Sequence, residues 1–150
     1  MGGIRCINSS PILTNLIIKE NSSHRGGGVS CNNSSPTLSD VMIHNNSAQH
    51  DGSGMFLYNS SNSTLSNLHF NSNTGGGTVH INFTSYPIFE NCVFIGNGTD
   101  QSDAVIKVTS NGSGFVNLTE CLISDNTTGI YLSNSELQKN GSRLIISSNP

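Results

Sequence analysis

Residues 26–46, GGGVSCNNSSPTLSDVMIHNN, repeat the pattern of residues 2–21, GGIRCINSSPILTNLIIKEN, with ten of 20 aligned positions identical. Later stretches fit the same frame, in which a small residue precedes an apolar one and a second apolar or thiol side chain follows two positions on. The first of these positions are Ile4, Val29, Met55, Val79, Ile106 and Ile130. The second are Cys6, Cys31, Leu57, Ile81, Val108 and Leu132. Successive copies are 24 to 27 residues apart, so the chain is a tandem array with a period of about 25 residues.

Each copy also carries a second alternating triplet, followed three residues later by asparagine. The triplets are Leu16/Ile18, Val41/Ile43, Leu68/Phe70, Cys92/Phe94, Cys121/Ile123 and Leu144/Ile146. The asparagines are Asn21, Asn46, Asn73, Asn97, Asn126 and Asn149. Alternation with period two predicts strands, and a unit this short must stack on its neighbours to bury an apolar face. We therefore predict an all-β parallel solenoid of about six coils over residues 1–150. We expect its asparagines to adopt the left-handed backbone conformation and to hydrogen-bond along the axis.

Composition excludes several classes of protein. Alanine occurs only at Ala48 and Ala104, which argues against a helical bundle. The net charge is -3 with six scattered Lys or Arg residues, so we expect no nucleic-acid groove and no basic membrane patch. No apolar run is long enough to insert into a membrane. No Cys-x-x-Cys or Cys/His spacing suggests a metal, and we expect no cofactor.

The two ends suggest a fragment. The sequence begins and ends inside the repeat frame and shows neither a signal peptide nor a polar capping repeat. We interpret residues 1–150 as a single array from a longer protein, and the uncapped ends predict self-association.

The pairing of a glycine-rich start with Phe-x-x-Asn resembles a known repeat. Gly26–Val29 shows the first half, and Phe70–Asn73 and Phe94–Asn97 show the second. This pairing is similar to the polymorphic outer-membrane protein repeat, found in secreted and autotransported β-helix proteins of the pectin-lyase-like superfamily. The resemblance implies a right-handed parallel β-helix at a secreted or cell-surface location. It implies little about function, because adhesins and autotransporter passengers both carry such repeats.

Four cysteines fall in two pairs on adjacent coils, Cys6 with Cys31 and Cys92 with Cys121. Stacked coils would bring each pair close enough for a disulfide. The alternative is that all four are buried free thiols that pack as small apolar side chains.

Two outward rows are candidate binding surfaces. The first is Arg5, Ser30, Phe56, His80, Lys107 and Tyr131. Its aromatic, cationic and hydrogen-bonding side chains predict a face that stacks on a glycan, with an ordinary solvated face as the alternative. The second row is Ile17, Met42, His69, Val93, Leu122 and Ile145. Its apolar character suggests a face covered by a surface protein, by another copy or by the parent chain, unless the facing is misassigned by one residue.

Two matching loops carry the candidate catalytic residues. His24-Arg25 and His50-Asp51 should lie close together on adjacent coils. Such a cluster could abstract a proton from a uronic acid, with Arg as base or charge stabiliser and His or a carboxylate as acid. The alternative is that these are solvated loop charges. Asp100 and Asp103 could contact a cation, but two carboxylates make a weak cage.

The favoured function is therefore a non-enzymatic, secreted or cell-surface β-helix module, such as an adhesin stalk or passenger that binds carbohydrate or a host protein. The alternative is a fragment of a carbohydrate-active enzyme, a polysaccharide lyase, epimerase or hydrolase. Such enzymes are expected to interrupt the repeat with long loops that build a cleft. The loops here stay at about seven residues or fewer, which favours the first function without excluding catalysis.

Overall fold

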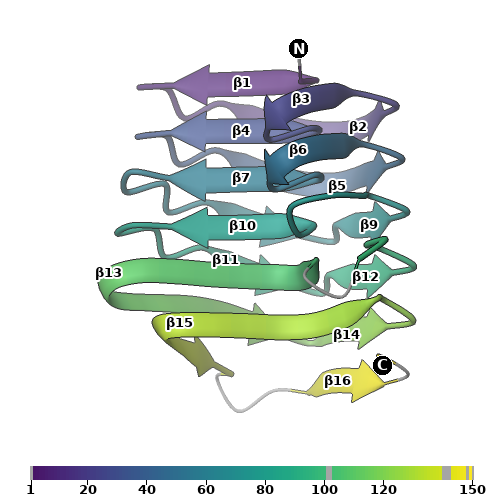
Figure 1. Cartoon of the computed structure of the whole chain (residues 1–150). Coiled ribbons are helices and arrows are strands. Elements are labelled where there is room, and N and C mark those ends of the chain that lie inside the picture. The colour runs from purple at the N-terminus through teal and green to yellow at the C-terminus, as the bar shows by residue number, and fades with distance from the viewer. Residues whose placement is uncertain (1, 101–102, 140–142, 148, 150) are drawn as a thin grey trace.

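The computed structural model describes residues 2–100, 103–139, 143–147 and 149, with the backbone alone for 111–114. The chain winds into a parallel β-solenoid, and no helix occurs among the described residues (Figure 1). The coils stack from the N-terminus at one end to the C-terminus at the other. Six copies of the repeat produce about five turns, slightly fewer than the six coils expected from the sequence.

The first face of the solenoid contains one strand from each copy of the repeat. Its strands are β1 (Ile4–Ile7), β4 (Val29–Asn32), β7 (Met55–Tyr58), β10 (Val79–Asn82), the first part of β13 (Ala104–Thr119) and β15 (Thr128–Gln138). All neighbours are parallel, and Ile4 pairs with Val29 as Ile106 pairs with Ile130. The sequence predicts that the apolar series beginning with Ile4 and the series beginning with Cys6 each pair residue by residue along this face. Every one of these pairings is present, so the predicted repeat frame is confirmed.

Two further faces close the coil. The second contains the first halves of β2 (Ile12–Lys19) and β5 (Thr37–His44), then β8 (Thr64–Ser66), β11 (Ile88–Glu90) and the ends of β13 and β15. The third contains the second halves of β2 and β5, then β9 (His69–Asn71), β12 (Val93–Ile95), β14 (Cys121–Ser124) and β16 (Leu144–Ser147). A separate pair, β3 (Ser22–Arg25) and β6 (Ser47–Asp51), joins the third face to the first.

Phenylalanine rings fill the middle of the solenoid. Phe70 and Phe94 stack almost parallel with centroids 4.7 Å apart, and Phe89 packs against Phe94 at 5.8 Å. All three are fully buried. Because parallel coils place equivalent residues about 4.8 Å apart, like side chains from successive turns pack directly on each other.

The asparagine column is continuous. In each step the side-chain oxygen of one asparagine accepts from the backbone N–H and the side-chain amide of the asparagine one coil earlier, as Asn73 Oδ1 does from Asn46. The expectation that the column asparagines themselves adopt the left-handed backbone is wrong. Positive φ occurs one position earlier, at Glu20, Asn45, Ser72, Gly96 and Asp125. The preceding residue makes the turn, and the asparagine side chain then points inward to the carbonyls of the neighbouring coil, such as Ile43 O for Asn73.

Four cysteines are free and buried. Cys6 lies directly opposite Cys31 in the parallel register. The hydrogen bond between these two thiols raises the pKa of Cys31, and burial raises it further, so Cys31 stays protonated. Cys92 and Cys121 each contact a carbonyl of their own coil, at Glu90 and Thr119. The structure therefore favours the thiol alternative.

A second polar column was not predicted. The backbone N–H groups of Ser9, Ser34 and Ser61 each donate to the serine hydroxyl one coil later, at 3.1, 3.3 and 3.1 Å. The accepting residues, Ser34, Ser61 and Ser85, are buried. Like the asparagines, these hydroxyls satisfy backbone groups at a corner where the strand ladder is interrupted.

Candidate functional site

A groove of about 830 Å³ opens on the outside of the first face. Its floor contains Arg5, Ser30 and Phe56, which occupy one outward column of β1, β4 and β7. Residues 23–26, from the end of β3, line it at the start of these strands. Residues 58–59 and 82–83 line it where β7 and β10 end. The groove therefore crosses several coils along the axis of the solenoid.

The β3–β6 pair forms a ridge beside this groove, and Figure 1 shows the two strands stacked next to each other. Ser23 pairs with Ala48 and Arg25 pairs with Asp51, so β6 contains one extra residue between them. Gln49 and His50 consequently lie opposite the single residue His24, as in a β-bulge. The Ser23 hydroxyl donates to the Arg25 carbonyl at 2.7 Å and holds the end of β3.

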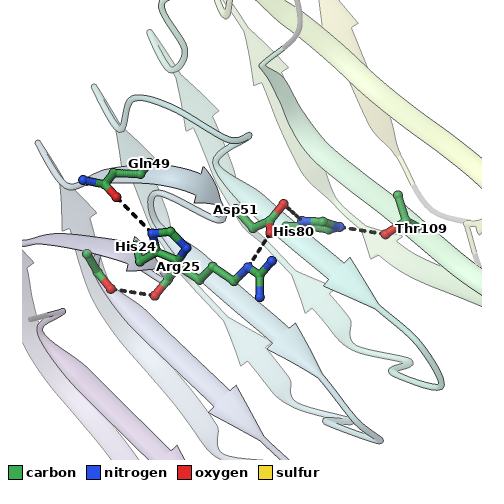
Figure 2. Close-up of polar contacts among 7 residues, drawn as sticks. His24, Arg25, Gln49, Asp51, His80 and Thr109 are labelled. Atoms are coloured by element: carbon green, nitrogen blue, oxygen red, sulfur yellow. Dashed lines mark hydrogen bonds and ion pairs between the residues drawn. The ribbon is translucent and has the colours of Figure 1, made fainter.

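A chain of polar contacts runs from this ridge into the first face (Figure 2). Arg25 Nε donates to Asp51 Oδ2 at 2.8 Å, and Asp51 Oδ1 lies 2.7 Å from His80 Nδ1. His80 Nε2 lies 2.7 Å from the hydroxyl of Thr109. Four coils thus contribute one side chain each, from β3, β6, β10 and β13.

His80 is neutral in this chain of contacts. Only 4% of the residue is exposed, and burial lowers its pKa. The negative charge of Asp51 opposes that shift, whereas Lys107 and Arg25 add to it. A neutral imidazole beside a carboxylate donates from Nδ1 to Asp51, and its Nε2 then accepts from the Thr109 hydroxyl.

The structure brings the four loop residues together in two pairs. Arg25 and Asp51 form the ion pair described above, with the Arg25 side chain 56% exposed and that of Asp51 16% exposed. His24 and His50 meet edge to face with ring centroids 4.3 Å apart, and His24 Nδ1 lies 2.9 Å from Gln49 Oε1. Asp51 has both carboxylate oxygens engaged, whereas Arg25 and His24 line the groove.

The first outward row has the predicted register but is not one open face. Arg5 and Tyr131 are exposed, and Lys107 is half-buried. Phe56 and His80, by contrast, are only 5% and 4% exposed. The expectation of a continuous solvent-facing row is wrong here, because the ridge and a neighbouring ring cover its middle. The Arg25 guanidinium lies 6.0 Å from the centre of the Phe56 ring, and Tyr58 stacks on the same ring at 4.8 Å.

The second outward row also has the predicted register, so the facing was not misassigned by one residue. Ile17 is 67% exposed and Met42 is 44% exposed. Val93, Leu122 and Ile145 are half-buried.

Sequence reasoning missed the other side of the groove, formed by Tyr58, Asn59, Asn82 and Phe83. One clue was available, since Phe83 stands where several other copies of the repeat have asparagine. Among the described residues, no three His, Cys, Asp or Glu side chains are arranged to hold a metal ion. Asp103 is buried, and its backbone N–H donates to the Asp100 carbonyl at 2.8 Å.

The stacked parallel coils define the class of protein, a β-solenoid. The family model for the right-handed β-helix region matches residues 2–149, and the chain belongs to that family. The comparisons with curated proteins and with solved structures gave no match. Within the part of the chain that the structure describes, no helix is long and apolar enough to cross a membrane.

Proposed function

We propose that this chain is a non-catalytic, secreted or cell-surface β-helix module that binds carbohydrate in the groove of the first face. The observation that carries the proposal is the combination of side chains in that groove. Arg5 and Arg25, Asn59 and Asn82, and the rings of Tyr58 and Phe83 all line one depression. The repeat's resemblance to secreted and autotransported proteins supports the proposed location.

Sugars present two kinds of surface, and the groove complements both. Aromatic rings match the apolar C–H faces of a pyranose, while amides and guanidinium groups hydrogen-bond its hydroxyls or carboxylates. Arg25 donates to Asp51 through Nε, and its side chain, 56% exposed, lines the groove. Successive coils repeat at about 4.8 Å, so a glycan extended along the axis would meet equivalent positions on consecutive coils.

Binding fits the groove better than catalysis does. A general acid or base must reach the ligand with an available proton or lone pair. His80 is buried with both ring nitrogens engaged, and both oxygens of Asp51 are engaged. His24 is exposed and lines the groove, so it is the remaining candidate for proton transfer and the residue by which the enzymatic alternative is tested.

The test is retardation of the purified chain in native gels that contain polygalacturonate, alginate, hydroxyethylcellulose or galactomannan. We expect retardation by at least one of them, and about tenfold weaker binding after Arg5→Ala, because the variant lacks a charged hydrogen-bond donor. Arg143→Ala is the matched control, since it makes the same charge change at an exposed residue outside the groove.

The same samples test the alternative. New reducing ends or the ultraviolet absorbance of unsaturated uronates, lost on His24→Ala, would show that the chain is an enzyme. Normal migration in all four gels would contradict carbohydrate binding.

A further inference from the structure

Phe83 has a backbone conformation that its side chain disfavours. It occupies the corner between the first and second faces, with φ of 56°. Equivalent corners of other coils use Asn8, Asn33, Asn59 and Asn134, with φ of 50°, 49°, 54° and 50°. Asparagine tolerates left-handed backbone, whereas a bulky residue there is a rare and strained exception. Asparagine is thus the residue that four of the six copies have at this corner, whereas coil four has phenylalanine and the next copy has Ser110.

Packing accounts for the phenylalanine only in part, and hydrogen bonding does not account for it. The residue is 43% exposed, so almost half of its surface remains in contact with water. Its backbone N–H points to Asn82 Oδ1 at 2.7 Å and to Thr109 O at 3.2 Å, contacts that any residue but proline would make. An asparagine here could also bond its neighbours along the corner, as Asn33 does with Asn8 at 2.8 Å, and phenylalanine cannot.

The ring instead lies where a ligand would meet it. Phe83 lines the groove together with Asn82 beside it and with Tyr58 and Asn59 one coil earlier. Tyr58 stacks on the buried ring of Phe56, with an angle of 21° between the planes, so Phe56 holds the Tyr58 ring in position. Strained residues that lack a structural reason tend to occur at functional sites.

We propose that Phe83 is a ligand-contacting residue, whose ring stacks on a sugar ring held in the groove. Asn59 and Asn82 line the same groove. Because Asn59 Nδ2 donates to Asn32 Oδ1 and Asn82 Oδ1 accepts from the Phe83 backbone N–H, Asn59 Oδ1 and Asn82 Nδ2 are the groups that bond the sugar hydroxyls. The inference rests on the carbohydrate-binding function proposed above, and it names the residue that provides the apolar contact.

The experiment replaces Phe83 by the residue that the corner prefers. For Phe83→Asn, we expect a higher melting temperature, because the strain is relieved, and affinity at least about fivefold lower in the gels that retard the wild type. Phe83→Trp keeps a ring at the same place and should retain binding. Ile88→Asn is the matched control, since Ile88 is 44% exposed in the same coil but lies outside the groove. It should leave the affinity unchanged.

The outcomes separate the two proposals. If the wild type is retarded and Phe83→Asn is retarded equally, the role of Phe83 is overturned while carbohydrate binding stands. A lower melting temperature for Phe83→Asn would show a structural role and would also overturn the inference. If the wild type is retarded in none of the gels, both proposals fail together.

Discussion

Asn97 illustrates how one buried side chain joins three coils. Its Oδ1 accepts from the backbone N–H and the side-chain amide of Asn73, and its Nδ2 donates to Phe70 O and Asn126 Oδ1. The residue is 1% exposed, so each of these groups would be unsatisfied without its partner. A shorter or apolar side chain at this position would therefore leave several buried polar atoms unpaired, which explains why the column contains asparagine alone.

His80 makes stability depend on pH. Burial places its pKa below the ordinary value of about 6.5, even though Asp51 opposes the shift, and the positive charges of Arg25 and Lys107 add to it. As the pH falls through about 6.5, the unfolded chain binds a proton at this residue that the folded chain does not. The free energy of unfolding should therefore decrease between pH 7.5 and pH 5.5, measured by urea denaturation.

His80→Gln supplies the control for this pH dependence. Glutamine does not titrate, so the decrease should be smaller in this variant. An identical decrease in the two proteins would contradict the assignment of His80 as a neutral, buried histidine.

At the scale of elements, the corner before β4 depends on close approach of two backbones. A Cβ on Gly27 would meet the carbonyl oxygens of Ser47 and Ser53, and one on Gly28 would lie 2.6 Å from the oxygen of Gly54. Neighbouring coils can form their hydrogen bonds here, such as Gly27 N to Gly52 O at 3.1 Å, because nothing projects between them. The glycine-rich start of the repeat is thus a packing requirement.

Gly27→Ala should consequently destabilise the fold by about 3 kcal/mol, because backbone atoms must move to admit the methyl group. Gly129→Ala is the matched control. The nearest atom to its new Cβ would be Ile146 Cγ2 at 4.0 Å, so we expect a change within about 0.5 kcal/mol. Urea denaturation of both variants checks the pair, and equal stability of the two would refute the close-approach explanation.

At the scale of the whole molecule, stability is shared between nearest neighbours. Each coil is supported by the coils above and below it, so the middle ones gain packing on two sides. Burial follows that rule, since Leu57, Ile81 and Phe89 are fully buried, whereas Leu132 is 37% exposed and Ile146 is 49% exposed.

Hydrogen exchange should therefore be graded along the axis. We expect the slowest amide exchange in β7, β10 and β11 and progressively faster exchange toward β1 and β16, because the outer coils open locally before the whole chain unfolds. Mass-spectrometric exchange at neutral pH measures this gradient. Uniform protection from β1 to β16 would show instead that the solenoid opens only as one cooperative unit.

The sequence by itself determined the repeat frame, the strands of the first and third faces, the register of the two outward rows and the asparagine column. These features follow from local alternation and fixed spacing, so stacking copies in register suffices to place them. It could also indicate that His24-Arg25 and His50-Asp51 meet, since both occupy the same position of adjacent coils.

Only the tertiary structure decided which outward residues are accessible. Ser22–Arg25 and Ser47–Asp51 have no apolar alternation, and they were expected to be loops. They pair as β3 and β6 and cover Phe56 and His80, leaving a groove beside them. The local sequence pattern cannot predict which residues become covered. Their accessibility depends on how polar segments of different coils pack against the first face once its strands have paired. The tertiary structure also decided which residue is left-handed at the corner after the third face. The residue before each column asparagine makes the turn, because the asparagine amide must point inward to the carbonyls of the neighbouring coil.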